Sequence, residues 1–77
     1  MINDWDVRMS NEFWETKGRY EKLHQMIIKL EAGTLDFKPK CPKALLRDQL
    51  DTMRHYLEVL AIRAEIEGVD LCGTKGA

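Results

Sequence analysis

Two long segments of this 77-residue chain carry apolar residues at alternating spacings of four and three. This repeat constrains the fold most, because it places those side chains on one stripe of an α-helix. The first stripe has a polar member, Thr16, among Met9, Phe13, Tyr20, Leu23, Ile27 and Leu30. The second stripe consists of Leu46, Leu50, Met53, Leu57, Leu60 and Ala64. The sequence therefore predicts two helices that each bury one stripe.

The ends of both helices are marked by residues with special backbone preferences. Asp4 and Ser10 each suit the N-cap of the first helix, and both starts remain open. A start at Ser10 leaves residues 1–9 as a short arm, whereas a start at Asp4 makes them a helix extension. Gly33 suits the left-handed position that follows a helix. The first helix is thus expected over residues 10–32, with or without the extension.

The second helix is bounded by Pro42 and Gly68. Proline fits the first helical position, and glycine again fits the left-handed end, so we expect a helix over 42–67. The fold class is then all-α, an antiparallel two-helix hairpin in one domain over 1–77. Its remaining parts are the N-terminal arm or extension over 1–9, a basic proline-containing connection over 33–41, and a C-terminal tail over 68–77.

Many apolar residues lie outside the two stripes, and a hairpin leaves them uncovered. They are Trp5, Trp14, Met26, Ile28, Leu45, Tyr56, Val59, Ile62 and Ile66. A chain of this size with one thin core is marginally stable, and exposed apolar stripes mark interaction surfaces. We therefore expect a homo-oligomeric helical bundle, with a four-helix dimer as the smallest assembly.

Composition excludes several classes of partner. A net charge of −1 with 32% charged residues argues against binding of a DNA or RNA duplex, which requires an excess of cations over a whole face. No run of about 18 apolar residues exists, so no membrane-spanning helix is expected. The acidic N-terminus lacks the apolar region of a secretory signal, which favours a cytoplasmic protein. Cys41 and Cys72 lie at opposite ends of the second helix, about 35–40 Å apart, so no internal disulfide is expected.

The connection places Lys38, Lys40, Lys43 and Arg47 around the start of the second helix. A helix N-terminus already carries partial positive charge, so cations are not favoured there. Either they are an ordinary solvated basic loop, or they hold an anion together with the amides at the helix start. In the second interpretation Lys43 and Arg47 bind phosphate groups and Lys40 adds charge.

Four further residues are candidates for contacts with a base or a ribose. They are Tyr20, Arg54, His55 and Tyr56. The alternative for the last three is an ordinary exposed or boundary position on the second helix. In an oligomer, Tyr20 of a neighbouring subunit could join the cations of the connection in one pocket.

Other chemistry finds little support in the sequence. Glu21 and His24 form the E-x-x-H pattern of di-iron bundles, but Asp51 and Glu58 on the second helix only flank its stripe. A surface Glu–His pair is favoured, and no metal or other cofactor is expected. Cys41 has no evident catalytic base, and the chain has no glycine-rich phosphate loop. We therefore expect no enzymatic activity.

The chain resembles small helical-hairpin proteins of tailed and crAss-like phages over roughly residues 10–71. The resemblance rests on residues 20–23 and 27–31 and on the pattern LL-x-x-Q-L-x-x-M-x-x-Y-L-x-x-L over 45–60. The order of helix, basic loop, proline and helix is also similar to phage nucleotide sponges, which sequester signalling nucleotides of CBASS or Thoeris defence between protomers. Pro42, Lys43 and Arg47 are the matching positions; the Ser-Arg-Glu run of anti-CBASS sponges is absent.

The resemblance implies a phage-encoded homo-oligomer in the host cytoplasm. Such a protein binds a cyclic or ADP-ribose-type immune signalling nucleotide without turnover and thereby blocks anti-phage defence. The expected ligand-binding residues are Lys40, Lys43, Arg47, Tyr20, Arg54, His55 and Tyr56. The alternative is a homo-oligomeric helical adaptor that binds a host or phage protein through its exposed apolar stripe.

Overall fold

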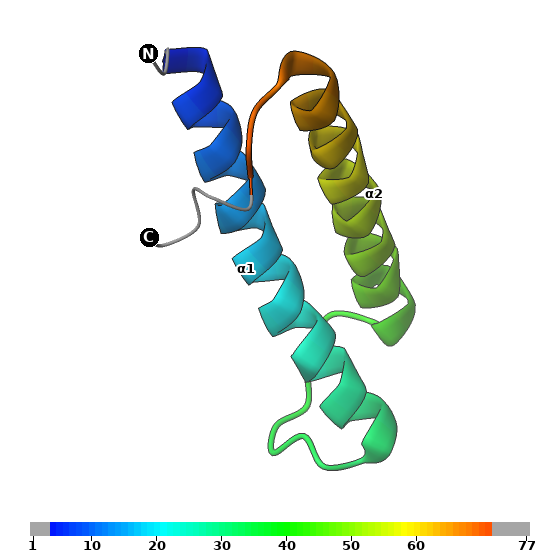
Figure 1. The fold of residues 1–77 in the computed structure, drawn as a ribbon. Coiled ribbons are helices and arrows are strands. Elements are labelled where there is room, and N and C mark those ends of the chain that lie inside the picture. Colours follow the sequence, from blue (N-terminus) through cyan, green and yellow to red (C-terminus); the bar gives the residue numbers. More distant parts are fainter. Residues whose placement is uncertain (1–3, 72–77) are drawn as a thin grey trace.

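The computed structural model describes residues 4–71 and contains two antiparallel helices (Figure 1). Helix α1 spans Asp4–Ala32 and helix α2 spans Lys43–Glu67. The described part of the chain forms no strand, and the two helices pack directly against each other. The all-α, two-helix prediction is confirmed.

Helix α1 begins at Asp4, so the prediction of an N-terminal arm is wrong for residues 4–9 and the helix extension is right. Residues 1–3 lie outside the described part. The added turns gain contacts with the end of α2, because the Trp5 indole N–H donates to Glu67 and the Arg63 guanidinium lies 5.0 Å from the Trp5 ring centre. Ser10 is buried inside the helix and does not cap its start.

Both glycine ends form as predicted. Gly33 has φ 77°, and the Thr34 amide donates to the Lys29 carbonyl at 2.9 Å. Gly68 has φ 74°, and the Val69 amide donates to the Ala64 carbonyl at 2.8 Å. Hydrogen bonds that reach back across a left-handed residue satisfy the last carbonyls of a helix.

The start of α2 differs by one residue from the prediction. Pro42 is the extended N-cap, with φ −60° and ψ 143°, and Lys43 is the first helical residue. The Pro42 carbonyl accepts hydrogen bonds from the amides of Leu45 and Leu46, both at 3.1 Å. Proline serves here because a cap residue needs a carbonyl acceptor and no amide donor.

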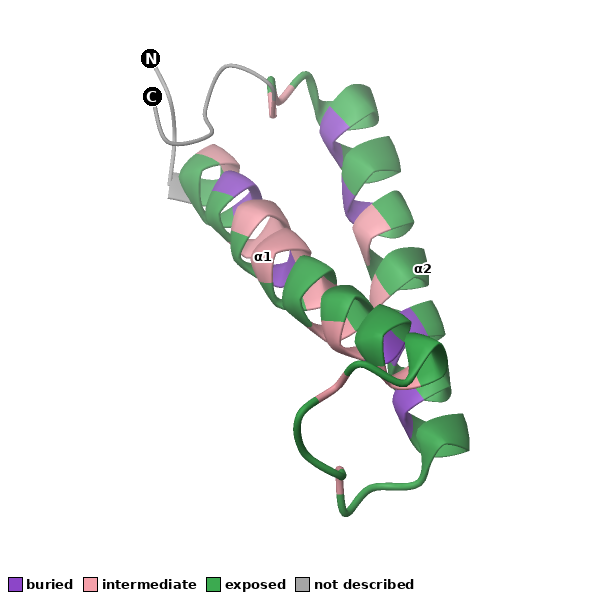
Figure 2. Ribbon diagram, turned by 90° about the horizontal axis from the view of Figure 1, so that it is seen from below, coloured by how far each residue is buried: buried purple, intermediate pink, exposed green. Residues whose placement is uncertain are grey.

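The predicted stripes meet between the helices, where every member is buried or half-buried (Figure 2). A cluster of Ile27, Leu46 and Leu50 forms the centre of the half of the core near the connection. The polar member, Thr16, is 3% exposed, and its hydroxyl donates to Glu12 and accepts from Arg19. These two bonds let a hydroxyl occupy the stripe without an unpaired polar atom.

Most of the apolar residues outside the stripes are exposed, as predicted. The exposed ones are Trp5, Ile28, Leu45, Tyr56, Val59, Ile62 and Ile66. Trp14 and Met26 are half-buried instead. The turn at Gly68 brings residues 69–71 back toward α1, and the Trp14 indole N–H donates to the Leu71 carbonyl at 3.0 Å (Figure 1).

Neither α1 nor α2 is sufficiently long and apolar to cross a membrane, judged over the residues described.

The two adjacent isoleucines near the end of α1 provide a matched test of the core. Ile27 is 3% exposed and Ile28 is 46% exposed. Ile27→Ala should lower the free energy of unfolding by about 2–5 kcal/mol, because it removes buried methyl groups and leaves a cavity. Ile28→Ala should cost less than about 1 kcal/mol. Urea unfolding followed by circular dichroism measures both, and equal losses would contradict this placement of the stripe.

Candidate functional site

The start of α2 lies beside the end of α1, and the cations of one helix meet a carboxylate of the other. Lys43 Nζ lies 2.7 Å from Glu31 Oε1, and Arg47 Nη1 lies 3.7 Å from Glu31 Oε2. All three side chains are about half exposed. The hydrogen bond and charge of Lys43, with a smaller contribution from Arg47, hold the pKa of Glu31 below its ordinary value. Glu31 was not a predicted site residue, although an antiparallel hairpin must bring the end of α1 to the start of α2.

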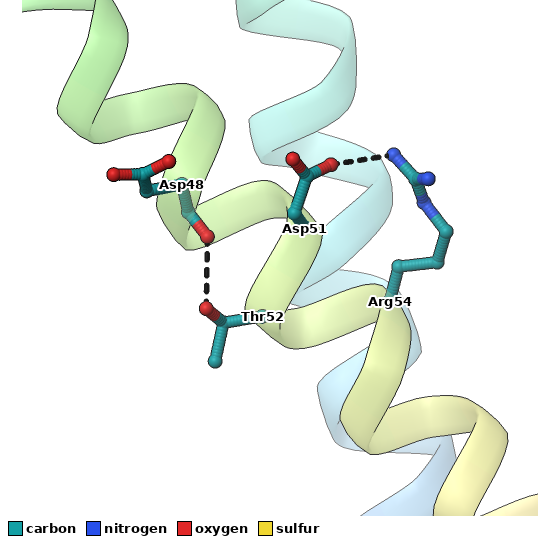
Figure 3. A network of polar contacts seen from close by, with 4 residues as sticks. All are labelled: Asp48, Asp51, Thr52 and Arg54. Atoms are coloured by element: carbon teal, nitrogen blue, oxygen red, sulfur yellow. Dashed lines mark hydrogen bonds and ion pairs between the residues drawn. The ribbon is translucent and has the colours of Figure 1, made fainter.

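Arg54 extends this charge along the same side of α2. Its guanidinium lies 2.8 Å from Asp51 Oδ1, as Figure 3 shows. A hydrogen bond with the Tyr20 hydroxyl is the main reason that the pKa of Arg54 is raised above its ordinary value, and the charge of Asp51 contributes as well. The Tyr20 ring in turn lies 5.6 Å from the ring of His24 on α1. Tyr20 on α1 thus contributes to the electrostatic surroundings of Arg54 on α2.

A shallow cavity of about 450 Å³ opens on this side of the hairpin. Its floor contains Ile27 and Leu50, and its polar wall contains Arg47 and Arg54. The full lining is His24, Ile27, Ile28, Glu31, Ala32, Arg47, Leu50 and Arg54. We call this surface, together with Lys43 and Tyr20, the cation face. It combines two guanidinium groups, one ammonium group and an apolar floor, which can accept an anion attached to a flat ring.

The remaining predicted site residues lie elsewhere in the single chain. Lys40 is exposed in the connection and lines a separate cavity of about 370 Å³ with Lys38, Pro39, Cys41, Pro42, Lys43 and Leu30. His55 is exposed on α2 and lines none of the cavities described here. Tyr56 lines a groove on the other side of the hairpin. Consecutive residues of a helix point about 100° apart, which explains why Arg54, His55 and Tyr56 separate.

The groove at Tyr56 contains a hydrogen-bond network that links the two helices. The Tyr56 hydroxyl donates to Glu12 Oε2 at 2.9 Å, and Glu12 also accepts from the buried Thr16. The hydrogen bond to Glu12 is the main reason that the pKa of Tyr56 is raised above its ordinary value. Glu12 and Tyr56 line a cavity of about 230 Å³ together with Trp5, Arg8, Met9, Leu60 and Arg63. Sequence reasoning missed Glu12, and the polar member at Thr16, one turn away, was the available signal.

The described residues contain no group of three or more His, Cys, Asp or Glu side chains able to hold a metal ion. Cys41 is exposed, and Cys72 lies outside the described part of the chain.

The contribution of the Glu31–Lys43 pair to stability can be tested through its dependence on pH. Because the pKa of Glu31 is lowered on folding, its pairing stabilises the protein above pH 4.5, and this contribution is lost as pH falls through the lowered folded value. Glu31→Gln should therefore be less stable than wild type at pH 7, with the difference shrinking as the pH is lowered below 4.5. Urea midpoints over this pH range measure it. Glu21→Gln, an exposed position earlier on α1, is the control; the same pH-dependent gap there would contradict a specific role for Glu31.

Comparison with known proteins identifies the family of this chain. The model of the Sequestin family matches residues 3–66, which covers nearly all of both helices and the connection. The chain belongs to the Sequestin family. Neither the curated proteins nor the solved structures contain a significant match.

Proposed function

We propose that this member of the Sequestin family is a sponge for a cyclic or ADP-ribose-type signalling nucleotide. It binds the nucleotide in the host cytoplasm without turnover, and removal of the signal blocks anti-phage defence. The family name points to sequestration of a ligand. The similarity of the helix–basic loop–proline–helix order to phage nucleotide sponges supports a nucleotide as that ligand.

The observation that carries the proposal is the excess of cations on the cation face. Lys43, Arg47 and Arg54 of that surface are in ionic contact with two carboxylates, Glu31 on the same surface and Asp51 beside it. One cation is therefore left without a matching carboxylate among these five groups. A bound phosphate would supply the missing negative charge, and the forked guanidinium groups suit its oxygens.

The first turn of α2 adds backbone donors. The Leu45 amide is bonded to the Pro42 carbonyl, so the amides of Lys43 and Ala44, which precede it, are those available to an anion. Binding costs little rearrangement, because Lys43 and Arg47 are half exposed and need only turn from Glu31 toward the ligand. The proposed mechanism is ionic capture followed by contact of Tyr20 and Arg54 with the base or ribose.

The predicted site residues outside the cation face could contact a nucleotide that is bound to a second copy of the chain. Lys40, His55 and Tyr56 cannot share one cavity with Arg47 in a single chain, since they lie in the connection, on exposed α2 surface and in the opposite groove. In a homo-oligomer, a neighbouring subunit can present them to a bound nucleotide. The exposed apolar residues of α2 give such an assembly a physical cause.

A capture assay tests the function directly. The protein is incubated with a panel of cyclic oligonucleotides and ADP-ribose derivatives, washed on a size filter, heat-denatured and analysed by HPLC. We expect one nucleotide to be retained and released with its mass unchanged. Recovery of every nucleotide in the wash, at protein concentrations well above micromolar, would contradict the sponge function, and recovery of a cleaved product would contradict binding without turnover.

The site is tested by a charge-matched pair of double variants. Lys43→Ala/Arg47→Ala should weaken binding of the captured nucleotide about tenfold or more, because hydrogen bonds to charged groups each contribute about 1.5–3 kcal/mol. Lys22→Ala/Lys29→Ala removes two cations from exposed positions of α1 and should leave the affinity nearly unchanged. Isothermal titration calorimetry measures both. Equal losses would show that net charge, and not the cation face, controls binding.

The second candidate is an adaptor that binds a host or phage protein. The exposure of Val59, Ile62 and Ile66 favours it, because exposed apolar residues along one helix suit a helical partner. This function requires the apolar residues of α2 and does not require Lys43 or Arg47.

A further inference from the structure

The outward surface of α2 carries a second heptad stripe, distinct from the stripe that packs on α1. Its members follow spacings of three and four, and all are exposed: Leu45, Asp48, Thr52, His55, Val59, Ile62 and Ile66. At about 100° per residue they centre nearly opposite Leu46, Leu60 and Ala64, which face α1. We call this set the outer seam. Its last three members are β-branched apolar residues, and Ile62 and Ile66 are 52% and 79% exposed.

The outward stripe of α1 differs from the outer seam. Continued at the same spacings, its positions are Val7, Asn11, Trp14, Gly18, Glu21, Gln25 and Ile28. Its large aromatic member, Trp14, is already covered, because its indole donates to the Leu71 carbonyl. From Gly18 onward the positions are small or polar except for the exposed Ile28. The outer seam of α2 is therefore more apolar than the outward stripe of α1, so the two helices do not expose apolar residues alike.

The polar members limit which part of the outer seam can be dry. Thr52 donates its hydroxyl to the Asp48 carbonyl at 2.9 Å, as Figure 3 shows, so burial of this side chain leaves no unpaired donor. Asp48 and His55 remain solvated groups in the first half of α2. The contact surface that needs no water thus runs from Val59 to Ile66.

We propose that the outer seam binds the same seam of a second copy, so that two α2 helices form a short parallel coiled coil. The seam is one stripe wide, and its borders are charged or already engaged. Glu58 and Glu65 lie on one border, while Tyr56 and Arg63 on the other contact α1 through Glu12 and Trp5. A single helix of matching shape therefore fits, and an identical helix supplies the same apolar residues in register.

Over the dry segment from Val59 to Ile66, the border charges favour one orientation. Asp51, Glu58 and Glu65 follow one border, and Gln49, Tyr56 and Arg63 follow the other. In a parallel pair each Glu58 faces the partner's Arg63, which gives two opposite-charge contacts. In an antiparallel pair centred on Val59 and Ile62, Glu58 faces the partner's Glu65, which gives two like-charge contacts. Arg63 can take part although it contacts α1, because its side chain is 44% exposed and its contact to Glu67, at 3.3 Å, uses one of its several donors.

The pair leaves the cation face accessible. Arg47 and Arg54 lie about a third of a turn from the centre of the outer seam, on the side of α2 that borders the cavity with His24. Association through the seam does not depend on the proposed nucleotide, so it is measured without any ligand. A failure of association and a failure of nucleotide binding are therefore separate results.

Analytical ultracentrifugation over a wide concentration range tests association. Wild type should reach twice the 9.0 kDa monomer mass, and Ile62→Asp should stay at the monomer mass over the same range. Val7→Asp changes an equally exposed β-branched residue on the outward side of α1 and should associate like wild type. Circular dichroism checks that each variant remains helical. A monomeric wild type, or a dimeric Ile62→Asp, would overturn the proposal; the first result would leave the seam open to a different protein.

Disulfide trapping tests the orientation in a Cys41→Ser/Cys72→Ser background. Ile66→Cys should form a cross-linked dimer under mild oxidation, because a parallel pair places the two residues at one level. In the antiparallel arrangement residue 66 meets the partner's residue 55. Cross-linking only when Ile66→Cys is mixed with His55→Cys would overturn the parallel orientation, and cross-linking of Ile66→Cys alone supports it.

Discussion

The stripe of apolar side chains between α1 and α2 is the interaction on which everything else in this hairpin depends. Over residues 4–71 the structure has two helices, and most of the large apolar side chains that are removed from water lie on this stripe. Its register determines every other contact. Once Ile27 packs on Leu46 and Leu50, Glu31 must lie beside Lys43, and the start of α1 must reach the end of α2 at Glu67.

The same register divides α2 into sides with different physical character. The inward side is apolar, one flank carries Arg47 and Arg54, and the outward side carries the outer seam. Each ionic contact on the cation face is exposed to solvent, which screens it, so it contributes little alone. Tight sequestration by such a surface requires several contacts at once and exclusion of water. A further subunit that packs over the cation face, through a contact separate from the outer seam, would provide both.

Local sequence patterns predicted what depends on local geometry. The apolar repeats specify both stripes, and Gly33 and Gly68 mark both helix ends because few other residues adopt a left-handed conformation without strain. The choice between Asp4 and Ser10 as the start of α1 depends on tertiary contacts, so local sequence could not decide it. Only the packing of Arg63 over Trp5 and the bond from Trp5 to Glu67 show why the longer helix is favoured.

The candidate site was harder to predict for a related reason. Arg54, His55 and Tyr56 are neighbours in sequence, but the helix turns each to a different side. Glu31 was not predicted because the local sequence at the start of α2 shows only like charges. The carboxylate comes from the end of α1, which the antiparallel packing brings beside them. A helical-wheel comparison of both helices would have separated Tyr56 from Arg54, whereas the distance from Glu31 to Lys43 required the structure.

Capture of an anion and association of two copies would use different forces on different sides of α2. Exposed ionic contacts weaken as salt screens them, whereas burial of Val59, Ile62 and Ile66 removes apolar surface from water and is not screened. In a parallel pair the two-fold axis runs along the α2 helices, so both basic connections lie at the same end. The cation faces, by contrast, lie on opposite sides of the pair. Lys43 and Arg47 would then bind an anion within one subunit, while burial of the outer seam would hold the two subunits together.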